Sequence, residues 1–520
     1  MGNINPLIRL DYPDVDVIRV EDTYYMVSTT MYFMPGCEIL RSYDLVHWEH
    51  AAYVYDRLDS TPEQCLQKGD IYGKGMWAAS FRYYKGKFYM IFVANDTQKT
   101  YLYIADRVEG PWEKRNIEGF YHDCSLLFDD DDRVYLAYGN RNIRLTELKP
   151  DLSGPLPGGL DRIVVRDAEG PFLGYEGTHF YKIDGKYYLF FIHWPPEAGR
   201  RTEACFVADS LEGEFMGGDI LNDDMGYFNQ GVAQGAIVDT PEGKWYAVLF
   251  QDRGAVGRIP VLMPMTWDNK YPVLGEAGKI PVEFEITSTR PSHVYEPMVQ
   301  SDDFIWEEGL SAEEEARNYG SFGFKSCWQF NHEPELSLVQ CDEEQGALWI
   351  TTGTVSDNIL RARNTLTQRM YDPGCSGEVT VDVSLLKEGD YAGICALQSC
   401  YGFVGVTKRN GKTFVVMNHK EAENPDIWGN KVEAGAEAEA VLMEGKEFRL
   451  KVEADFTDRK DEAQFFYFKD DRWVKIGPTH KLHYKLDHFT GCRFGLFVYS
   501  TREAGGKAGF KNFVYTKKEV

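Results

Sequence analysis

The phrase KGKFYM at residues 85–90 decides the fold of this chain, because it has four counterparts within the first 250 residues. Each copy joins a turn to an aromatic-rich strand and places a Tyr at the same point of the phrase. The tyrosines follow one another at intervals of 46 to 64 residues, each long enough for a four-stranded sheet. Repeats of this size with a strand-turn-strand signature predict a five-bladed β-propeller. The other copies are VEDTYYM ending at Met26, DDDDRVYL at Leu136, DGKYYL at Leu189 and EGKWYA at Ala247.

The repeat also makes five residues upstream of the tyrosines equivalent to one another. Eleven or twelve positions before each Tyr stand Asp14, Trp77, Asp123, Glu176 and Gln234. Because blades surround a common axis, we expect these side chains to meet at one mouth of the propeller. Three of the five are carboxylic acids, which repel one another and drive their pKa values apart. Glycoside hydrolysis needs such a division, with one carboxyl donating a proton and another remaining ionised.

Each acid, taken alone, has a structural interpretation as a turn residue. The spacing that all three acids share relative to the repeated tyrosines is what favours a catalytic site. It selects Asp14 over its neighbours Asp11 and Asp16, and Asp123 over the DDDD run at 129–132, which we interpret as a solvated hairpin tip.

The sequence changes in character after the fifth repeat, which divides the chain into three parts. Residues 1–290 form the predicted propeller, which is the catalytic domain if the acids act as proposed. Residues 291–320 are polar and acidic and read as a connector. Residues 321–520 contain many short strand-like segments without the repeated phrase, which predicts an antiparallel β-sandwich as an accessory domain. The expected fold class is therefore all-β.

Composition narrows the expected partners. A formal net charge of −25 argues against nucleic acid, whose binding depends on Lys and Arg contacts to phosphate. No apolar run is long enough to span a bilayer, and no secretory signal is visible. Ten scattered cysteines without a CxxC pair indicate reduced, mostly buried thiols. We expect a cytoplasmic protein that acts on a small neutral molecule; the sequence carries no indication of oligomeric state.

At this point the chain resembles glycoside hydrolase family 43, a family of inverting enzymes with a five-bladed propeller. The resemblance covers nearly all 520 residues and is carried by NPLIRLDYPDVDVIRV at 5–20, FYHDCSLLFDDD at 120–131 and YEGTHFYKIDGKYYL at 175–189. WQFNHEPE at 328–335 and YAGICALQ at 391–398 are similar to the sandwich of the xylosidase and arabinofuranosidase branch. The resemblance thus implies a five-bladed propeller followed by a concanavalin-like antiparallel β-sandwich.

The resemblance also implies roles for individual residues. It makes Asp14 the general base, Glu176 the general acid, and Asp123 the acid that orients the donor and modulates its pKa. The segment GMWAASFRYYKGKFYM is similar to a strand that supplies a pocket wall, here Trp77. LFQDRGAVGR resembles the segment whose Arg lines the pocket, here Arg258.

Further candidates for substrate binding are Gln234, the fifth ring member, and the aromatic residues Phe33 and Trp194, which could stack on a sugar. The expected activity is exo-acting, inverting release of terminal α-L-arabinofuranose or β-D-xylose from arabinoxylan-derived oligosaccharides, with arabinofuranose favoured. Inversion implies that the base and acid carboxyls lie roughly 6.5–9.5 Å apart.

No cofactor is expected, and the sequence departs from its relatives at both places where they hold calcium. Where some relatives place a His on the propeller axis, this chain has Gln234. Where many sandwiches supply a ligating acid, this chain reads AGFKNF, with Gly509 and Lys511. Asp302 and Asp303 remain as candidate ligands of a structural calcium.

Two other functions are compatible with parts of this pattern. A retaining β-fructosidase combines the same two architectures, but the Arg-Asp-Pro and Glu-Cys motifs of that family are missing where strands begin. A non-catalytic, carbohydrate-binding propeller is the second alternative, although such a protein would ordinarily have lost one of the three acids.

Overall fold

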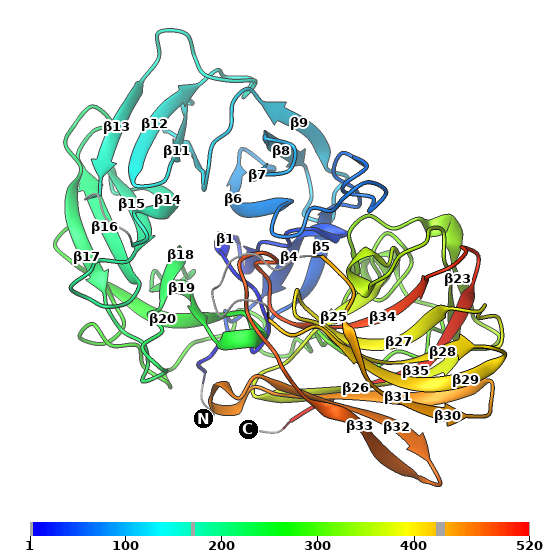
Figure 1. Ribbon diagram of the computed structural model, residues 1–520. Helices are drawn as coiled ribbons and strands as arrows, with labels where there is room; N and C mark the ends of the chain where they lie inside the picture. The colour runs from blue at the N-terminus through cyan, green and yellow to red at the C-terminus, as the bar shows by residue number, and fades with distance from the viewer. Residues whose placement is uncertain (1–3, 168–171, 423–431, 519–520) are drawn as a thin grey trace.

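A computed structural model describes residues 4–167, 172–422 and 432–518, and it consists of a five-bladed propeller followed by a β-sandwich (Figure 1). Each blade is a four-stranded antiparallel sheet, and the five-bladed prediction is confirmed. The blades comprise β1 (Asp16–Val20), β2 (Thr23–Val27), β4 (Gly36–Ser42) and β5 (Glu49–Tyr55); β6 (Met76–Tyr84), β7 (Lys87–Ala94), β8 (Lys99–Ala105) and β9 (Glu113–Ile117); β10 (Ser125–Phe128), β11 (Val134–Tyr138), β12 (Asn142–Leu148) and β13 (Asp161–Arg166); β14 (Glu176–Ile183), β15 (Lys186–His193), β16 (Thr202–Ala208) and β17 (Met216–Leu221); β18 (Ala233–Asp239), β19 (Trp245–Asp252), β20 (Arg258–Asp268) and β21 (Tyr271–Leu274).

The repeated phrase is the hairpin that joins the first two strands of each blade. Its Tyr always lies in the second strand, for example Tyr25 in β2 and Tyr89 in β7. The first strands contact one another in a closed ring, β1 to β6, β6 to β10, β10 to β14, β14 to β18 and β18 back to β1. Residues just before these strands are therefore brought to one mouth of the propeller.

The C-terminal part is a sandwich of an eight-stranded and a seven-stranded antiparallel sheet. A short propeller strand, β3 (Phe33–Met34), pairs with β22 and so extends the larger sheet. The remaining strands are β22 (Gln329–Asn331), β23 (Val339–Asp342), β24 (Ala347–Thr351), β25 (Leu366–Arg369), β26 (Gly374–Asp382), β27 (Asp390–Leu397), β28 (Gly402–Arg409), β29 (Lys412–His419), β30 (Ala436–Met443), β31 (Glu447–Asp455), β32 (Glu462–Lys469), β33 (Arg472–Lys481), β34 (Arg493–Ser500) and β35 (Lys507–Lys517).

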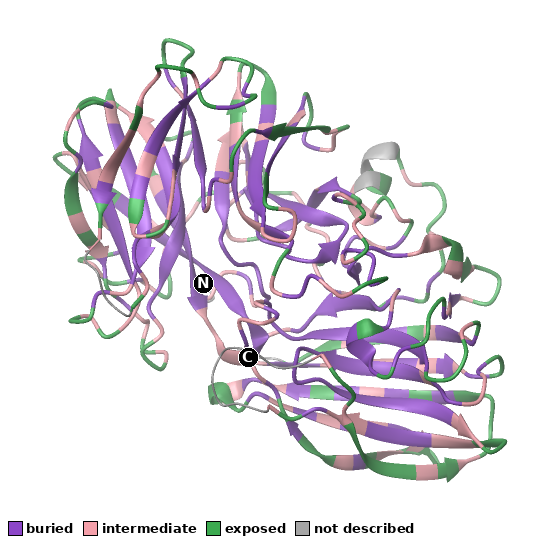
Figure 2. Ribbon diagram, turned by 45° about the horizontal axis from the view of Figure 1, so that its top comes forward, coloured by how far each residue is buried: buried purple, intermediate pink, exposed green. Residues whose placement is uncertain are grey.

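The sandwich core follows from the alternation of residues along its strands. In β31, Phe448, Leu450 and Val452 are buried while Glu447 and Arg449 are exposed. Alternate side chains of a strand point to opposite faces, so this pattern buries one face of the sheet. Figure 2 shows the buried residues between the two sheets and along the inner strands of the blades.

A buried ion pair joins the two domains. Arg369 of β25 donates to Glu38 of β4 over 2.8 Å, and its guanidinium lies 4.0 Å from the centre of the Tyr12 ring. Burial alone would raise the pKa of Glu38, but Arg369 and His50 lower it to about 2. Because loss of either partner would leave a buried charge, both domains depend on this contact.

The connector contacts both domains. Glu296 donates its backbone N–H to Glu49 of β5 over 2.9 Å, and Asp302 exchanges backbone hydrogen bonds with Phe513 of β35. The short helix α1 (Ala312–Asn318) follows in the connector, and its first turn is closed by a capping box of Ser311 and Glu314.

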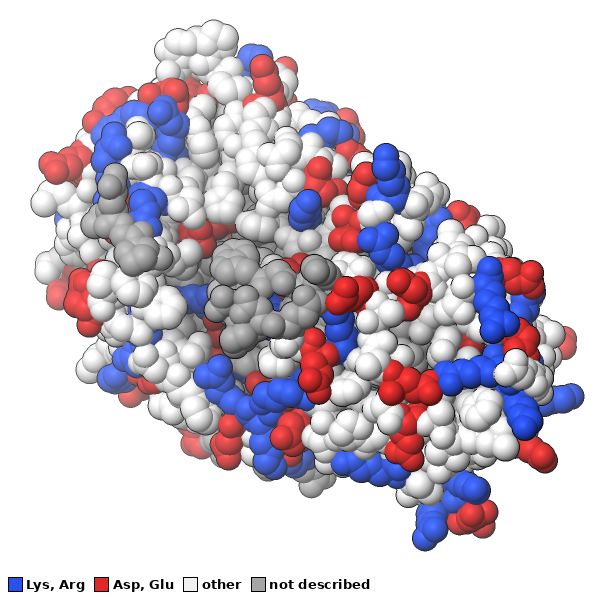
Figure 3. Space-filling model, in the orientation of Figure 1, with Lys and Arg blue, Asp and Glu red and all other residues white. Residues whose placement is uncertain are grey.

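The surface and the thiols agree with the composition. All ten cysteines are free thiols, and nine are buried, as expected. On the face shown in Figure 3, basic and acidic side chains are interspersed. Within the described residues, no helix is long and apolar enough to cross a membrane.

Candidate active site

All five ring residues line one pocket of about 480 Å³ at the mouth of the propeller. Asp14 and Asp123 stand two residues before β1 and β10, whereas Glu176 is the first residue of β14. Trp77 and Gln234 are the second residues of β6 and β18. Three blades therefore deliver three carboxyl groups to the same cavity, as the spacing of the repeat predicts.

The backbone at this mouth is strained at equivalent places. Asp14, Asp123 and Gln234 have left-handed φ angles of 52°, 47° and 61°, and Gly177 after Glu176 has 63°. A left-handed conformation costs a non-glycine residue roughly 1–2 kcal/mol. At Gly177 a Cβ atom would lie 2.4 Å from the Gln234 side chain, so any other residue there would displace that side chain. Such strain concentrates at functional sites, where it directs side chains into a cavity.

Asp14 is held on both of its oxygens. Its Oδ1 accepts from Arg258 Nη1 over 2.7 Å, and its Oδ2 accepts from Thr29 Oγ1 over 2.8 Å. Burial raises the pKa of Asp14; Arg258 opposes this rise and the charge of Asp123 adds to it. The carboxyl is thus fixed in position and more basic than an ordinary aspartate, which suits a group that removes a proton from water.

Asp123 is tied to the strand that carries the third acid. Its Oδ2 accepts from the backbone N–H of Gly177 over 3.0 Å. Burial raises the pKa of Asp123, with the positive charge of His122 opposing the rise and Glu176 adding to it. Asp123 therefore fixes the backbone immediately after Glu176 and lies beside its carboxyl.

Glu176 is the most accessible of the three acids, with a side chain 20% exposed against 8% for Asp14 and for Asp123. Asn140 Nδ2 donates to its Oε2. His122 Nε2 lies 3.6 Å from the same oxygen and 3.5 Å from Asp123 Oδ2. Asp123 and Glu176 raise the pKa of His122 to about 9, so its imidazole is positively charged at neutral pH. Glu176 is thus the acid that an incoming ligand reaches most readily.

Trp77 and Arg258 form walls of the pocket, together with Phe489 of the sandwich. The Trp77 ring lies 5.8 Å from His122 and 5.7 Å from Phe489. The Arg258 guanidinium lies 4.5 Å from the centre of the Phe489 ring.

The structure corrects the placement of Phe33 and shows the surroundings of Trp194. Phe33 is 1% exposed in the core between the domains, beneath the Arg493 guanidinium at 3.4 Å, because its strand extends the sandwich sheet. Trp194 also stands outside the described lining of the pocket; its backbone N–H binds Leu173 and its ring packs at 5.8 Å from Phe172. Phe33 is therefore not positioned to stack on a sugar in this cavity, whereas sugar stacking by Trp194 stays a prediction.

The acids next to Asp14 have structural partners instead. Asp11 Oδ2 accepts from the backbone N–H of Gly491 over 2.7 Å and so joins propeller to sandwich. Asp16 is fully buried and accepts from Arg82 over 2.7 Å. Of these three neighbouring acids, Asp14 is the one that lines the pocket.

Several pocket residues were missed by the sequence reasoning. His122 adjoins Asp123, so adjacency could have found it, whereas Asn140 lies in the turn before β12 and outside the register of the repeat. Tyr484, Leu486 and Phe489 come from the sandwich and close the remaining side of the cavity. The sandwich therefore contributes a wall of the pocket.

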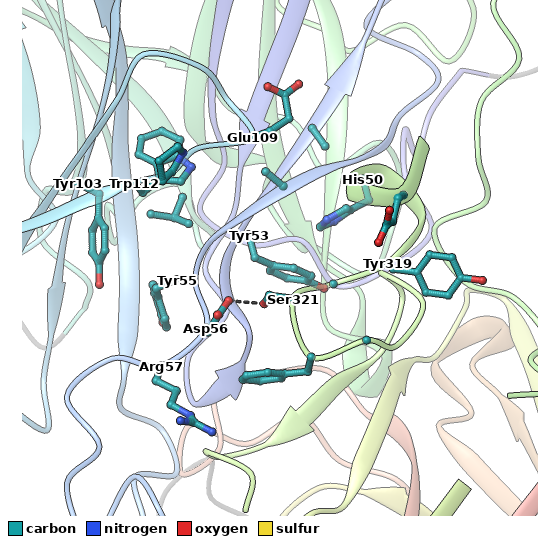
Figure 4. A pocket seen from close by; sticks show the side chains of 18 of the residues that line it. His50, Tyr53, Tyr55, Asp56, Arg57, Tyr103, Glu109, Trp112, Tyr319 and Ser321 are labelled. Atoms are coloured by element: carbon teal, nitrogen blue, oxygen red, sulfur yellow. Dashed lines mark hydrogen bonds between the residues drawn. The ribbon is translucent and has the colours of Figure 1, made fainter. Parts of the chain in front are cut away.

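A larger groove of about 1010 Å³ lies elsewhere, between β5, the segment before β9 and the connector (Figure 4). It contains none of the five ring residues. Its polar groups bind one another, as Ser321 does with Asp56, or bind outside it, as Lys114 does with Asp59. Convergence of acids, rather than size, therefore identifies the candidate site.

Two places in the described residues bear on the question of a bound metal ion. His122, Asp123 and Glu176 each offer one ligand atom within 4.8 Å of the others, and a metal ion bound there would displace the proton of the His122 imidazole. In the connector, Asp302 already accepts from Phe304 N over 2.9 Å and from Trp328 Nε1 over 2.8 Å.

Two family models match the chain. Residues 4–272 match glycosyl hydrolases family 43, and residues 320–516 match the β-xylosidase C-terminal concanavalin A-like domain. The first match covers more than half of the chain, and the second confirms the expected class of sandwich.

Individual relatives agree with these matches. A solved bifunctional GH43-CE protein of Bacteroides eggerthii is 40% identical over 99% of this chain, with a TM-score of 0.88; this chain spans 64% of that longer one. A solved GH43 glycoside hydrolase, engineered to display endo-xylanase and exo-arabinofuranosidase activity, is 28% identical over 99% of both chains, with a TM-score of 0.85. A β-xylosidase of Formosa agariphila is 24% identical over 98% of this chain and 90% of its own length.

Proposed function

The chain belongs to glycosyl hydrolases family 43, and from this premise we propose that it is an exo-acting, inverting glycosidase that releases terminal pentoses from arabinoxylan-derived oligosaccharides. One observation carries the proposal: Asp14, Asp123 and Glu176, delivered by three different blades, line a single pocket. Paired carboxyl groups facing a scissile bond are what glycoside hydrolysis requires.

Glu176 is the proton donor in this proposal. It is the most exposed of the three acids, so its carboxyl can reach the glycosidic oxygen. Proton transfer to the leaving oxygen leaves a carboxylate on Glu176. The positive charge of His122 at 3.6 Å stabilises that carboxylate, and Asn140 holds one of its oxygens in place.

Asp14 is the base. It removes a proton from a water molecule that attacks the anomeric carbon on the face opposite the leaving group. Arg258 and Thr29 fix both carboxylate oxygens, so the water meets a group of defined orientation. Asp123 acts through position and charge, since it binds Gly177 and lies next to the donor.

The shape of the pocket favours attack at a chain end. Blade residues line it on several sides, and Tyr484, Leu486 and Phe489 of the sandwich line it as well. A cavity of about 480 Å³ that residues of both domains line has the size for a terminal sugar, which supports an exo-acting enzyme. No cofactor enters the mechanism, and the free, mostly buried thiols support a reducing, cytoplasmic location.

The sugar is proposed to be α-L-arabinofuranose first and β-D-xylose second. Side-by-side assays with the 4-nitrophenyl glycosides of both pentoses test this. We expect hydrolysis of both, with the arabinofuranoside having the higher kcat/KM. Hydrolysis of neither, with pentose binding retained, would instead support a non-catalytic carbohydrate-binding propeller, and activity on a β-fructofuranoside alone would support the fructosidase alternative.

A further inference from the structure

The segment between β33 and β34 runs from the sandwich toward the propeller (Figure 1), and its residues Tyr484, Leu486 and Phe489 line the active-site pocket. It is fastened to the propeller at its C-terminal end. Gly491 donates its backbone N–H to Asp11 over 2.7 Å, and Cys492 donates to Ala255 O over 2.9 Å. A Cβ atom at position 491 would lie 2.0 Å from Val256 O, so this close approach requires glycine. The pocket wall formed by this segment is therefore fixed in place.

Tyr484 in this segment has a hydroxyl group without a partner. Its Oη is buried and, among the residues that the structure describes, has no hydrogen bond. Burial raises the pKa of Tyr484 well above its usual range, so the hydroxyl remains a neutral donor and acceptor. The charges acting on this hydroxyl include those of the proposed base Asp14 and of its partner Arg258.

A buried hydroxyl without a hydrogen bond destabilises a folded protein, so a ligand group that binds it is favoured. Other unpartnered buried polar atoms belong to residues lining the same cavity. They are Trp77 Nε1, Arg258 Nε and Nη2, Arg201 Nε and Asp252 Oδ1. Since sugar hydroxyls both donate and accept, this mixed set matches a polyhydroxylated ligand.

We propose that Tyr484 Oη binds a hydroxyl group of the terminal pentose next to Arg258, so that the glycone site is built from both domains. The proposal rests on the proposed glycosidase function and extends it, because it assigns sugar recognition to a side chain of the accessory domain. Phe489 supports the arrangement, since its ring lies between Tyr484, at 6.4 Å, and Trp77, at 5.7 Å.

The variant Tyr484→Phe removes only the hydroxyl. We expect kcat/KM on 4-nitrophenyl α-L-arabinofuranoside to fall about 5- to 20-fold, mainly through a higher KM, because one hydrogen bond to the sugar is lost. The melting temperature should stay unchanged or rise, because no group of the described residues binds this hydroxyl. The nitrophenyl group contains no sugar, so a loss on this substrate locates the effect at the glycone.

Tyr401→Phe is the matched control in the same domain. Tyr401 Oη accepts from Gly435 N over 2.7 Å and donates to Glu433 O over 3.2 Å, so this variant should melt at a lower temperature with unchanged kcat/KM. A Tyr484→Phe protein with unchanged kcat/KM, whatever its melting temperature, overturns the proposal.

Calorimetric titration of the wild-type and Tyr484→Phe proteins with L-arabinose and D-xylose separates this proposal from the glycosidase function. Pentose binding without hydrolysis would reject only the glycosidase function, and weaker binding by the variant would still support Tyr484. A wild-type protein that neither binds nor hydrolyses a pentoside rejects both.

Discussion

Replacing Glu176 by Gln should lower kcat on an arabinoxylan oligosaccharide by about 10²–10⁴-fold, the usual contribution of a general acid. The amide keeps the size of the carboxyl but cannot protonate the leaving oxygen. On a 4-nitrophenyl glycoside the loss should be much smaller, because nitrophenolate departs without a proton. The measurement is kcat for both substrates with the wild-type protein and the Gln variant.

The control for this variant is Glu212→Gln, an exposed glutamate in the turn before β17, which should keep full activity. Pentose affinity measured by calorimetry should survive in Glu176→Gln, since the donor acts on the leaving group. Equal losses on the oligosaccharide and the nitrophenyl substrate would exclude Glu176 as the proton donor, even if activity fell.

Replacing Asp14 by Asn should also lower kcat by about 10²–10⁴-fold, but with a different dependence on substrate. The attacking water must lose its proton whatever the leaving group is, so oligosaccharide and nitrophenyl substrates should lose the same factor. Asp131→Asn, in the exposed turn before β11, should be unaffected. A loss confined to the oligosaccharide would make Asp14 the acid instead of the base.

The pH dependence of kcat/KM gives a second test of the role of Asp14 as the base. The base must be ionised to act, and burial raises its pKa, so the acid limb of kcat/KM should lie above the range of an ordinary aspartate. Arg258 opposes this rise. Replacing Arg258 by Met should therefore move the acid limb of the residual activity to higher pH. An acid limb at the same pH in this variant would show that the pKa of a group other than Asp14 determines it.

The five-fold repeat was enough to predict the propeller and the ring of five pocket residues. A repeat places equivalent positions at equivalent points, so spacing carried information that single motifs lacked. It separated Asp14 from Asp11 and Asp16, whose side chains bind Gly491 and Arg82.

Contacts between distant segments were not predictable in the same way. Phe33 was wrongly proposed as a sugar-stacking residue because nothing near it in the sequence shows that its strand pairs with β22. Tyr484 and Phe489 lie in a segment without a repeat, and only the docking of the sandwich brings them to the pocket. His122 gains its significance from the two carboxyl groups that surround it in space.

The stereochemistry of the first product tests the central claim most directly, because base-assisted attack by water requires inversion. Proton NMR of 4-nitrophenyl α-L-arabinofuranoside hydrolysis, recorded before the anomers of the free sugar equilibrate, reports it. We expect β-L-arabinofuranose to appear first, with Asp14 activating the water and Glu176 protonating the leaving oxygen. If α-L-arabinofuranose appears first, the configuration is retained, and the assignment of Asp14 as a base acting on water is contradicted.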